Sequence, residues 1–149
     1  MDAQNPACRI PSQNQGTDDV IKKIFAMKTI AVVGCSPKPE RPSHYVAAYL
    51  KERGYRIIPV NPGHKEILGE KCYPNLSEIP EAVDVVEVFR RPEEVLPIIK
   101  DAIRFKAKAL WLQDAITHPE GEGLARQAGL LVVSDDCMMR RHVRMHPDG

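Results

Sequence analysis

The sequence predicts a doubly wound α/β domain, in which one mostly parallel, five-stranded sheet carries helices on both faces. Three observations predict this fold class. Short β-branched runs alternate along the chain with amphipathic segments of helical length. The first run, Thr29–Gly34, ends at a glycine and leads through a loop into a helix that begins at Ser43. The run Asp84–Phe89 is nearly all apolar, as expected for a strand that is covered on both faces.

The N-terminal half contains a helix, a strand, a second helix and a second strand. A short helix begins at Asp18 or Asp19, because an aspartate can accept hydrogen bonds from the free N–H groups of a first helical turn. The strand Thr29–Gly34 follows, and apolar residues at helical spacing then predict a helix over 43–53. Gly54 suits the left-handed position that ends a helix. The second strand, Tyr55–Asn61, ends at a Pro-Gly turn.

The C-terminal half repeats this alternation after a long connection, residues 64–82, that holds a short apolar element near 67–73. Thr117 and Glu120 are three residues apart ahead of a helical segment, which is the pattern of a capping box. The remaining predicted elements are the strand 84–89, a helix around 95–103, the strand Lys108–Gln113, a helix from Thr117 to Gly129, the strand Leu130–Ser134 and a last helix at 136–145.

Composition limits the classes of function. The chain has 149 residues, 43% of them hydrophobic, and a formal net charge of +1, so no overall field attracts nucleic acid or a membrane surface. Its four cysteines are widely spaced and no apolar run reaches membrane-spanning length, which predicts a reduced, cytoplasmic protein. Residues 1–17 are polar and rich in Gln, Asn and Pro. We expect a disordered tail there and one domain over 18–146.

Each of the first three predicted strands is followed by two basic side chains or histidines. These residues are Lys38 and Arg41, then His64 and Lys65, then Arg90 and Arg91. In an open parallel sheet the ligand crevice lies beyond the carboxyl ends of the strands, so the three loops meet at one edge. Lysine and arginine at such an edge favour a ligand that carries several phosphates.

The loop after the first strand differs from a dinucleotide-binding loop. Pro37, Pro39 and Pro42 lack the backbone N–H groups that a G-x-G-x-x-G loop offers to pyrophosphate. The second strand ends at Asn61-Pro62, where an NAD-binding fold usually has an acid for the ribose hydroxyls. A neutral amide followed by basic residues suits a phosphorylated ribose, which leaves NADP as an alternative.

Four segments carry a resemblance to a known family: residues 32–43, 54–62, 83–92 and 107–113. They resemble the small, single-domain CoA-binding proteins with a Rossmann-like fold that are related to the CoA-binding domain of succinyl-CoA synthetase α-subunits. The resemblance covers about residues 20–142. It implies that the loop after the first strand, the Asn61-Pro62 turn, the Phe89-Arg90-Arg91 segment and the end of the fourth strand line a CoA site.

We therefore expect a protein that binds CoA or an acyl-CoA through its ADP and phosphate moiety, as a non-catalytic binding or regulatory protein. The expected binding residues are Gly34, Ser36, Lys38, Arg41, Ser43, Asn61, Pro62, Phe89, Arg90 and Gln113. The serines would donate to phosphate, and the lysine and arginines would neutralise its charge. Two alternatives remain, a small NADP- or NAD-dependent oxidoreductase and a ligand-free protein-interaction module on the same fold.

The chain departs from the family pattern at two places. Asp114-Ala115 stands where a hydrophobic residue and a glycine are usual, so the family pattern does not define the shape of the fourth loop. Asp136 stands where an arginine is usual, and an acid near the site would weaken polyphosphate binding.

Other candidate groups have simpler interpretations. Cys35 lies in the ligand loop, where basic neighbours would activate a thiol, but packing beneath the loop is the favoured interpretation. Cys137, His142 and His146 lack a second pair of ligands, so no metal site is predicted.

Overall fold

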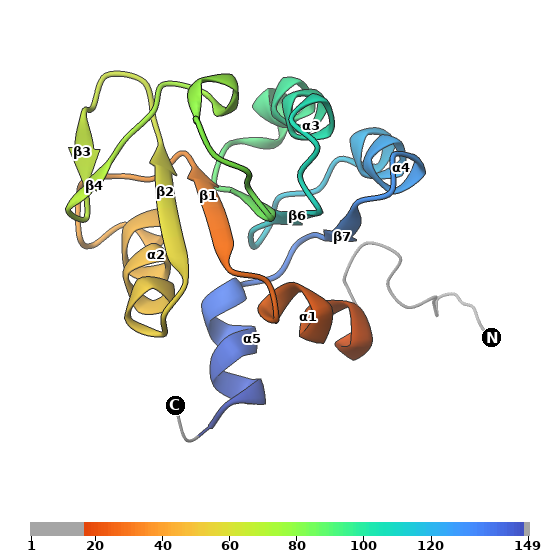
Figure 1. The fold of residues 1–149 in the computed structure, drawn as a ribbon. Helices are drawn as coiled ribbons and strands as arrows, with labels where there is room; N and C mark the ends of the chain where they lie inside the picture. The colour runs from red at the N-terminus through yellow and green to blue at the C-terminus, as the bar shows by residue number, and fades with distance from the viewer. Residues whose placement is uncertain (1–16, 148–149) are drawn as a thin grey trace.

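A five-stranded parallel sheet with the order β2-β1-β5-β6-β7 forms the centre of the computed structural model, which describes residues 17–147 (Figure 1). The strands are β1 (Thr29–Val33), β2 (Arg56–Val60), β5 (Val85–Val88), β6 (Ala109–Leu112) and β7 (Leu131–Val133). Every neighbouring pair is parallel, so the α/β fold class predicted from the sequence is confirmed. The predicted tail at 1–17 lies, apart from Thr17, outside the described residues.

Strand β1 is the point at which the order of the sheet reverses. It pairs with β2 on one side and with β5 on the other, so that Val33 lies opposite both Val60 and Val88. The chain leaves β1 toward one edge of the sheet and later returns to build the other half. Loops that follow two such strands diverge, and the gap between them is the usual ligand crevice of this architecture.

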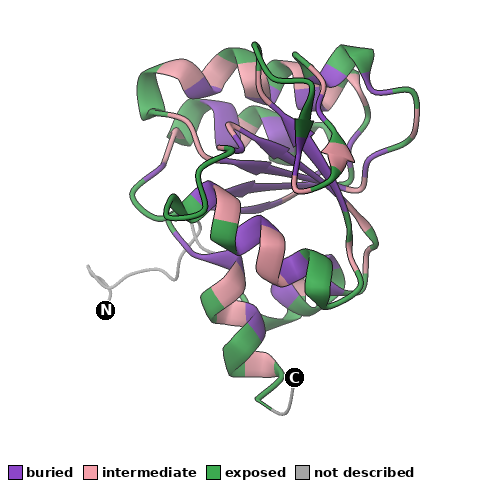
Figure 2. Cartoon of the chain, turned by 90° about the vertical axis from the view of Figure 1, so that its left-hand side faces the viewer, coloured by how far each residue is buried: buried purple, intermediate pink, exposed green. Residues whose placement is uncertain are grey.

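Helices cover both faces of the sheet (Figures 1 and 2). One face packs against α1 (Asp18–Phe25), α2 (Pro42–Glu52) and α5 (Met138–Met145). The other face packs against α3 (Val95–Arg104) and α4 (Pro119–Gln127). Because successive strand residues point to opposite faces, Ile30 and Val32 join the first core while Ala31 and Val33 join the second.

The connection from β2 to β5 holds the smaller elements. Only a short apolar element was expected there, but the chain forms an antiparallel hairpin of two-residue strands, β3 (Glu66–Ile67) and β4 (Glu70–Lys71), followed by the 3₁₀ turn η1 (Leu76–Glu78). A second 3₁₀ turn, η2 (Pro92–Glu94), follows β5. Strands this short have no periodicity that a sequence pattern can reveal.

Two predicted helix N-caps are wrong, and the last helix begins at Met138 instead of residue 136. The N-cap of α1 is Thr17, whose hydroxyl accepts from the N–H of Val20 at 3.3 Å, instead of an aspartate at 18 or 19. The N-cap of α4 is His118, whose Nδ1 accepts from the N–H of Gly121 at 2.9 Å. Because His118 is the N-cap, the predicted capping box with Thr117 does not form. Pro119 occupies the first helical position, where a backbone N–H would have no partner within the helix.

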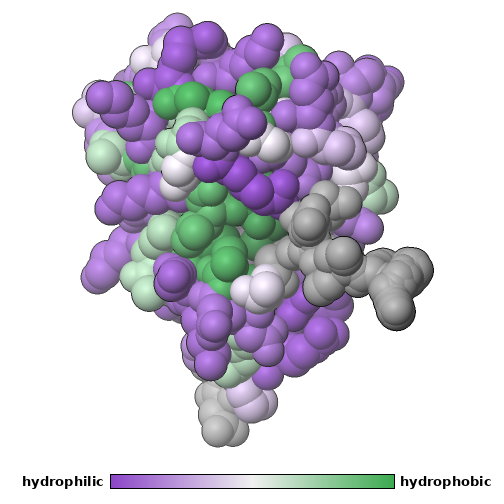
Figure 3. Space-filling view, turned by 90° about the vertical axis from the view of Figure 1, so that its right-hand side faces the viewer, coloured by the Kyte–Doolittle hydropathy of each residue, from purple (hydrophilic) through white to green (hydrophobic). Residues whose placement is uncertain are grey.

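The sheet ends at β7. On that side of the molecule, apolar side chains gather into a patch that is framed by hydrophilic ones (Figure 3). No helix within residues 17–147 is long and apolar enough to cross a membrane.

Candidate nucleotide-binding site

The loop after β1 is held against the end of β5 by a glycine. Gly34 has a φ of +87°, and a Cβ atom built on it would lie 2.4 Å from the carbonyl oxygen of Phe89. Both the conformation and the close approach exclude a larger residue. Gly34 thus brings the β1 loop next to the segment that carries Phe89 and Arg90, on the two sides of the point where the sheet order reverses.

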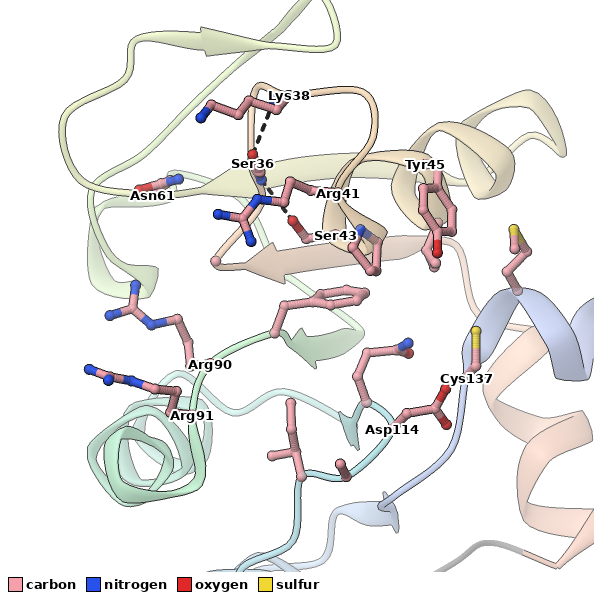
Figure 4. A pocket seen from close by; sticks show the side chains of 18 of the residues that line it. Ser36, Lys38, Arg41, Ser43, Tyr45, Asn61, Arg90, Arg91, Asp114 and Cys137 are labelled. Carbon is pink, nitrogen blue, oxygen red and sulfur yellow. Dashed lines mark hydrogen bonds between the residues drawn. The ribbon is translucent and has the colours of Figure 1, made fainter.

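Two serines give the loop its shape (Figure 4). The hydroxyl of Ser43, buried in the first turn of α2, accepts from the N–H of Ser36 at 2.9 Å. The hydroxyl of Ser36 accepts from the N–H of Lys38 at 3.1 Å. Each hydroxyl keeps its own proton for donation. The serines therefore build the loop as acceptors, and their donation to phosphate stays a prediction.

Asn61 connects the β1 loop to β2. Its side-chain amide donates to the backbone carbonyl oxygen of Cys35 at 2.7 Å, and its backbone carbonyl oxygen accepts from the thiol of Cys72 at 3.4 Å. Cys35 is fully buried, and burial raises the pKa of its thiol to about 12. A thiol in that state is a packing group and a poor nucleophile, in line with the favoured interpretation of the sequence.

A cavity of about 1280 Å³ opens at this edge of the sheet. Nine of the ten expected binding residues line it: Gly34, Ser36, Lys38, Arg41, Ser43, Asn61, Phe89, Arg90 and Gln113. Pro62 instead lines an adjoining cavity of about 240 Å³ to which Gly34 and Arg90 also contribute. Of the two basic candidates after β2, His64 lines the large cavity and Lys65 does not.

The basic side chains at the cavity fall into two groups. Arg90 and Arg91 share the carboxylate of Glu94, with Arg91 Nη2 at 2.7 Å and Arg90 Nε at 2.9 Å. Their hydrogen bonds, that of Arg90 first, hold the pKa of Glu94 below its usual value. Lys38 and Arg41 are exposed and form no ion pair with any residue of the described chain. Positive charge therefore exceeds negative charge at this end, and these two side chains are available to a ligand.

The two acidic residues that depart from the family pattern, Asp114 and Asp136, are both paired with arginines. Asp114 pairs with Arg140 at 2.8 Å, and this hydrogen bond lowers the pKa of Asp114. Asp136 is buried, does not line the cavity, and accepts from Arg141 Nε at 2.8 Å and from Arg140 Nη2 at 3.3 Å. The expectation that Asp136 places a free acid near the site is therefore not met.

Ala115 shows why a glycine is usual at this position of the fourth loop. Its φ is +66°, the left-handed region in which a Cβ atom is disfavoured. The N–H of Ala115 donates to the carboxylate of Asp135 at 2.7 Å, and the N–H of Asp135 donates to the carbonyl of Ile116 at 3.2 Å. These two bonds between neighbouring loops hold the shape that a glycine would adopt freely.

Much of the remaining lining comes from helices and was not predicted from the sequence. It includes Tyr45 and Val46 on α2 and Met139, Arg140 and Val143 on α5, together with Ile116 and Cys137 in neighbouring loops. Gln113 supports α5, because its side-chain oxygen accepts from the N–H of Met138 at 3.2 Å. Tyr45 lies outside the buried, apolar face of α2, and an aromatic residue in that position was the one sequence feature that could have indicated this part of the lining. No cluster of three or more metal-ligating side chains occurs between residues 17 and 147.

Residues 28–143 match the sequence model of the CoA binding domain family. The chain belongs to the CoA binding domain family. The resemblance drawn from the four sequence segments is thereby confirmed at the level of the family. An uncharacterized protein of Bacillus subtilis, YneT, is 35% identical over 130 residues, which cover 87% of this chain and 96% of YneT.

Two further comparisons place this CoA binding domain among larger and smaller proteins. An ADP-forming acetate–CoA ligase of Archaeoglobus fulgidus is 34% identical over 79 residues, but these are 52% of this chain and only 12% of the ligase. A solved structure of a hypothetical protein from Pyrococcus horikoshii superposes with a TM-score of 0.85 at 40% identity, covering 91% of this chain and 96% of that one. The same domain thus occurs both alone and as a small part of a ligase.

Proposed function

We propose that this protein binds CoA or an acyl-CoA, with the ADP and phosphate moiety in the cationic half of the cavity. One observation carries the proposal. Lys38 and Arg41 stand without acidic partners in residues 17–147, on the loop that follows β1, at the usual ligand position of a doubly wound sheet. Membership of the CoA binding domain family supports the choice of ligand.

The lining gives each part of the nucleotide a partner. Lys38 and Arg41 neutralise the phosphates, since charge-assisted hydrogen bonds to phosphate are the strongest that side chains offer. The hydroxyl of Ser36 donates to a phosphate oxygen while its own oxygen holds the loop. Phe89, half-buried and beside Gly34, provides an aromatic surface against which a base or sugar can pack.

We propose binding instead of turnover. The two carboxylates among the described lining residues, Glu94 and Asp114, are both held in ion pairs with arginines. Their pKa values are lowered, so both stay ionised and occupied near neutral pH. A carboxylate held in this way is a poor general base, because it must first leave its arginine.

The test is titration calorimetry with CoA on a variant that carries both Lys38→Ala and Arg41→Ala. A charge-assisted bond contributes about 1.5–3 kcal/mol, so we expect affinity to fall about tenfold or more for each residue removed. The matched control carries Lys22→Ala and Lys23→Ala, which remove the same charge from the exposed side of α1. Equal CoA affinity of the two double variants would overturn the placement of the phosphates.

A further inference from the structure

The cavity has two chemically different ends (Figure 4). Lys38, Arg41, Arg90 and Arg91 lie at one end, whereas Tyr45 lies on the side toward α5. The lining that α2 and α5 contribute includes four apolar side chains, those of Tyr45, Val46, Met139 and Val143. Beside them lie Asp114 and Arg140, which are paired with each other.

The apolar end contains an unusual concentration of exposed hydrophobic surface. The described chain leaves three large apolar side chains exposed: Tyr45 at 44%, Val143 at 48% and Leu124 at 36%. Tyr45 and Val143 both line this cavity, and Leu124 lies on α4 outside it. Apolar surface left exposed beside a ligand cavity commonly marks a binding region.

The walls of the apolar end are fixed in place. Met139 and Val143 are four residues apart on α5, so both side chains lie on one face of that helix. Helix α5 is held to α2 by the hydrogen bond between the hydroxyl of Tyr49 and Nδ1 of His142, at 2.9 Å. Arg140, also on α5, is paired with Asp114, so no unpaired charge separates the apolar end from the cationic one.

From this geometry we infer that the apolar end holds the acyl chain of a CoA thioester, and that the preferred ligand is an acyl-CoA with a chain of several carbons. The inference rests on the proposed binding of the CoA nucleotide at the cationic end. CoA is long, and its thiol lies far from its phosphates, so a nucleotide bound at Lys38 and Arg41 directs the thioester away from them. Because the cavity is continuous, the chain enters the apolar end of the same site.

The match of charge and shape favours this occupant over a protein partner. The ligand must be anionic at one end and apolar at the other, as an acyl-CoA is. The cavity of about 1280 Å³ also exceeds the ~300–1,000 Å³ that is usual for sites of small molecules, which leaves room beyond the nucleotide. A partner protein would contact Tyr45 and Val143 but would not need the interior of the cavity.

The experiment compares the affinities of CoA, acetyl-CoA and octanoyl-CoA by titration calorimetry. A fully buried methylene raises affinity about fourfold, so partial burial of six additional methylenes predicts at least a tenfold preference for octanoyl-CoA over acetyl-CoA. Val143→Asn lowers this preference several-fold by placing an amide against the chain. Leu124→Asn makes the same kind of change at an exposed position outside the cavity and leaves the preference intact.

The outcomes separate the two proposals. If CoA does not bind, the proposed function itself fails. If CoA binds and octanoyl-CoA binds no more tightly than acetyl-CoA, the acyl site is overturned while the nucleotide site stands. Tyr45→Ser serves as a second variant should Val143→Asn fail to fold. Sedimentation equilibrium of the wild type and of Val143→Asn completes the test. If the wild type is a dimer, Val143→Asn is a monomer and affinity does not depend on acyl chain length, this face binds a second copy of the chain instead.

Discussion

At the scale of single residues, the burial of Glu87 was not predicted, because it is the one charged residue inside the apolar run of β5. It lies in the middle of β5, with Val32 and Trp111 opposite it on the two neighbouring strands. Its side chain is completely buried, and neither carboxyl oxygen has a hydrogen-bond partner. This burial raises the pKa of Glu87 to about 8, so the carboxyl group is largely protonated at neutral pH.

Replacing Glu87 with methionine should stabilise the protein at high pH. The unfolded chain loses this proton near pH 4.5 and the folded chain only near pH 8. The contribution of Glu87 to folding stability is therefore full below pH 4.5 and falls as the pH rises toward 8. Glu87→Met removes this loss and should raise the free energy of unfolding at pH 8 by about 3–5 kcal/mol relative to its effect at pH 4.5.

Urea unfolding of the wild type and the variant at both pH values measures the difference. Glu87→Gln is the control, because a neutral amide also removes the titration but keeps the shape and polarity of the side chain. If Glu87→Met changes the free energy of unfolding equally at both pH values, the carboxyl group has a partner or solvent in the folded chain.

At the scale of elements, α5 connects the apolar end of the site to a cluster of rings. His142 is buried, with the ring of Phe25 edge-on at 5.0 Å and that of His146 stacked at 4.3 Å. Its Nδ1 bonds the hydroxyl of Tyr49 on α2. Burial, with smaller contributions from His146 and Arg53, lowers the pKa of His142 below its usual 6.5.

Acid should therefore loosen α5. A histidine with a lowered pKa is neutral in the folded chain, so its contribution is full above pH 6.5 and is lost as the pH falls through the folded pKa. We expect His142→Gln to change the melting temperature more favourably at pH 5.5 than at pH 7.5, because it removes the histidine that acid would charge. His64→Gln, at an exposed position, is the matched control, and its effect on the melting temperature should be the same at both pH values. An effect of His142→Gln that is equal at both pH values would show that the charge state of His142 does not affect the stability of the folded chain.

The elements also show which parts of the fold and of the site could be predicted from the sequence. The five strands were predictable to within one or two residues, because a buried parallel strand is a continuous apolar run between turns. The cationic half of the site was predictable because Gly34, Lys38 and Arg41 lie close together in one loop. The apolar half was not, because Tyr45 and Val143 lie on helices whose mutual position is set by tertiary packing.

At the scale of the whole molecule, local and total charge differ. The chain carries a formal net charge of +1, yet Lys38, Arg41, Arg90 and Arg91 gather at one edge of the sheet with Glu94 as a counter-charge. The parallel topology causes this, because it brings the carboxyl ends of all five strands to the same edge. Affinity for phosphate is thus expected at one place, and only for ligands whose shape brings their phosphates there.

This concentration of charge predicts an order of ligands: CoA binds most tightly, dephospho-CoA next and NAD least. Dephospho-CoA lacks the 3′-phosphate, which we expect to contact His64 at the cavity wall. NAD binds least tightly because Asn61 stands where an NAD site has an acid that accepts from the ribose hydroxyls. A ligand at 100 times its dissociation constant stabilises the folded state by about 2.7 kcal/mol. For a chain of this length that corresponds to a rise in melting temperature of roughly 5–10 °C.

Thermal unfolding with each ligand at one concentration, followed by competition against CoA, measures this order. The variant with Lys38→Ala and Arg41→Ala is the control, and its shifts should be smaller for all three ligands because each carries a diphosphate. NAD binding that equals or exceeds CoA binding would favour a nicotinamide-dependent oxidoreductase. No shift with any ligand would favour an interaction module, since a folded chain that binds nothing gains no stability from added ligand.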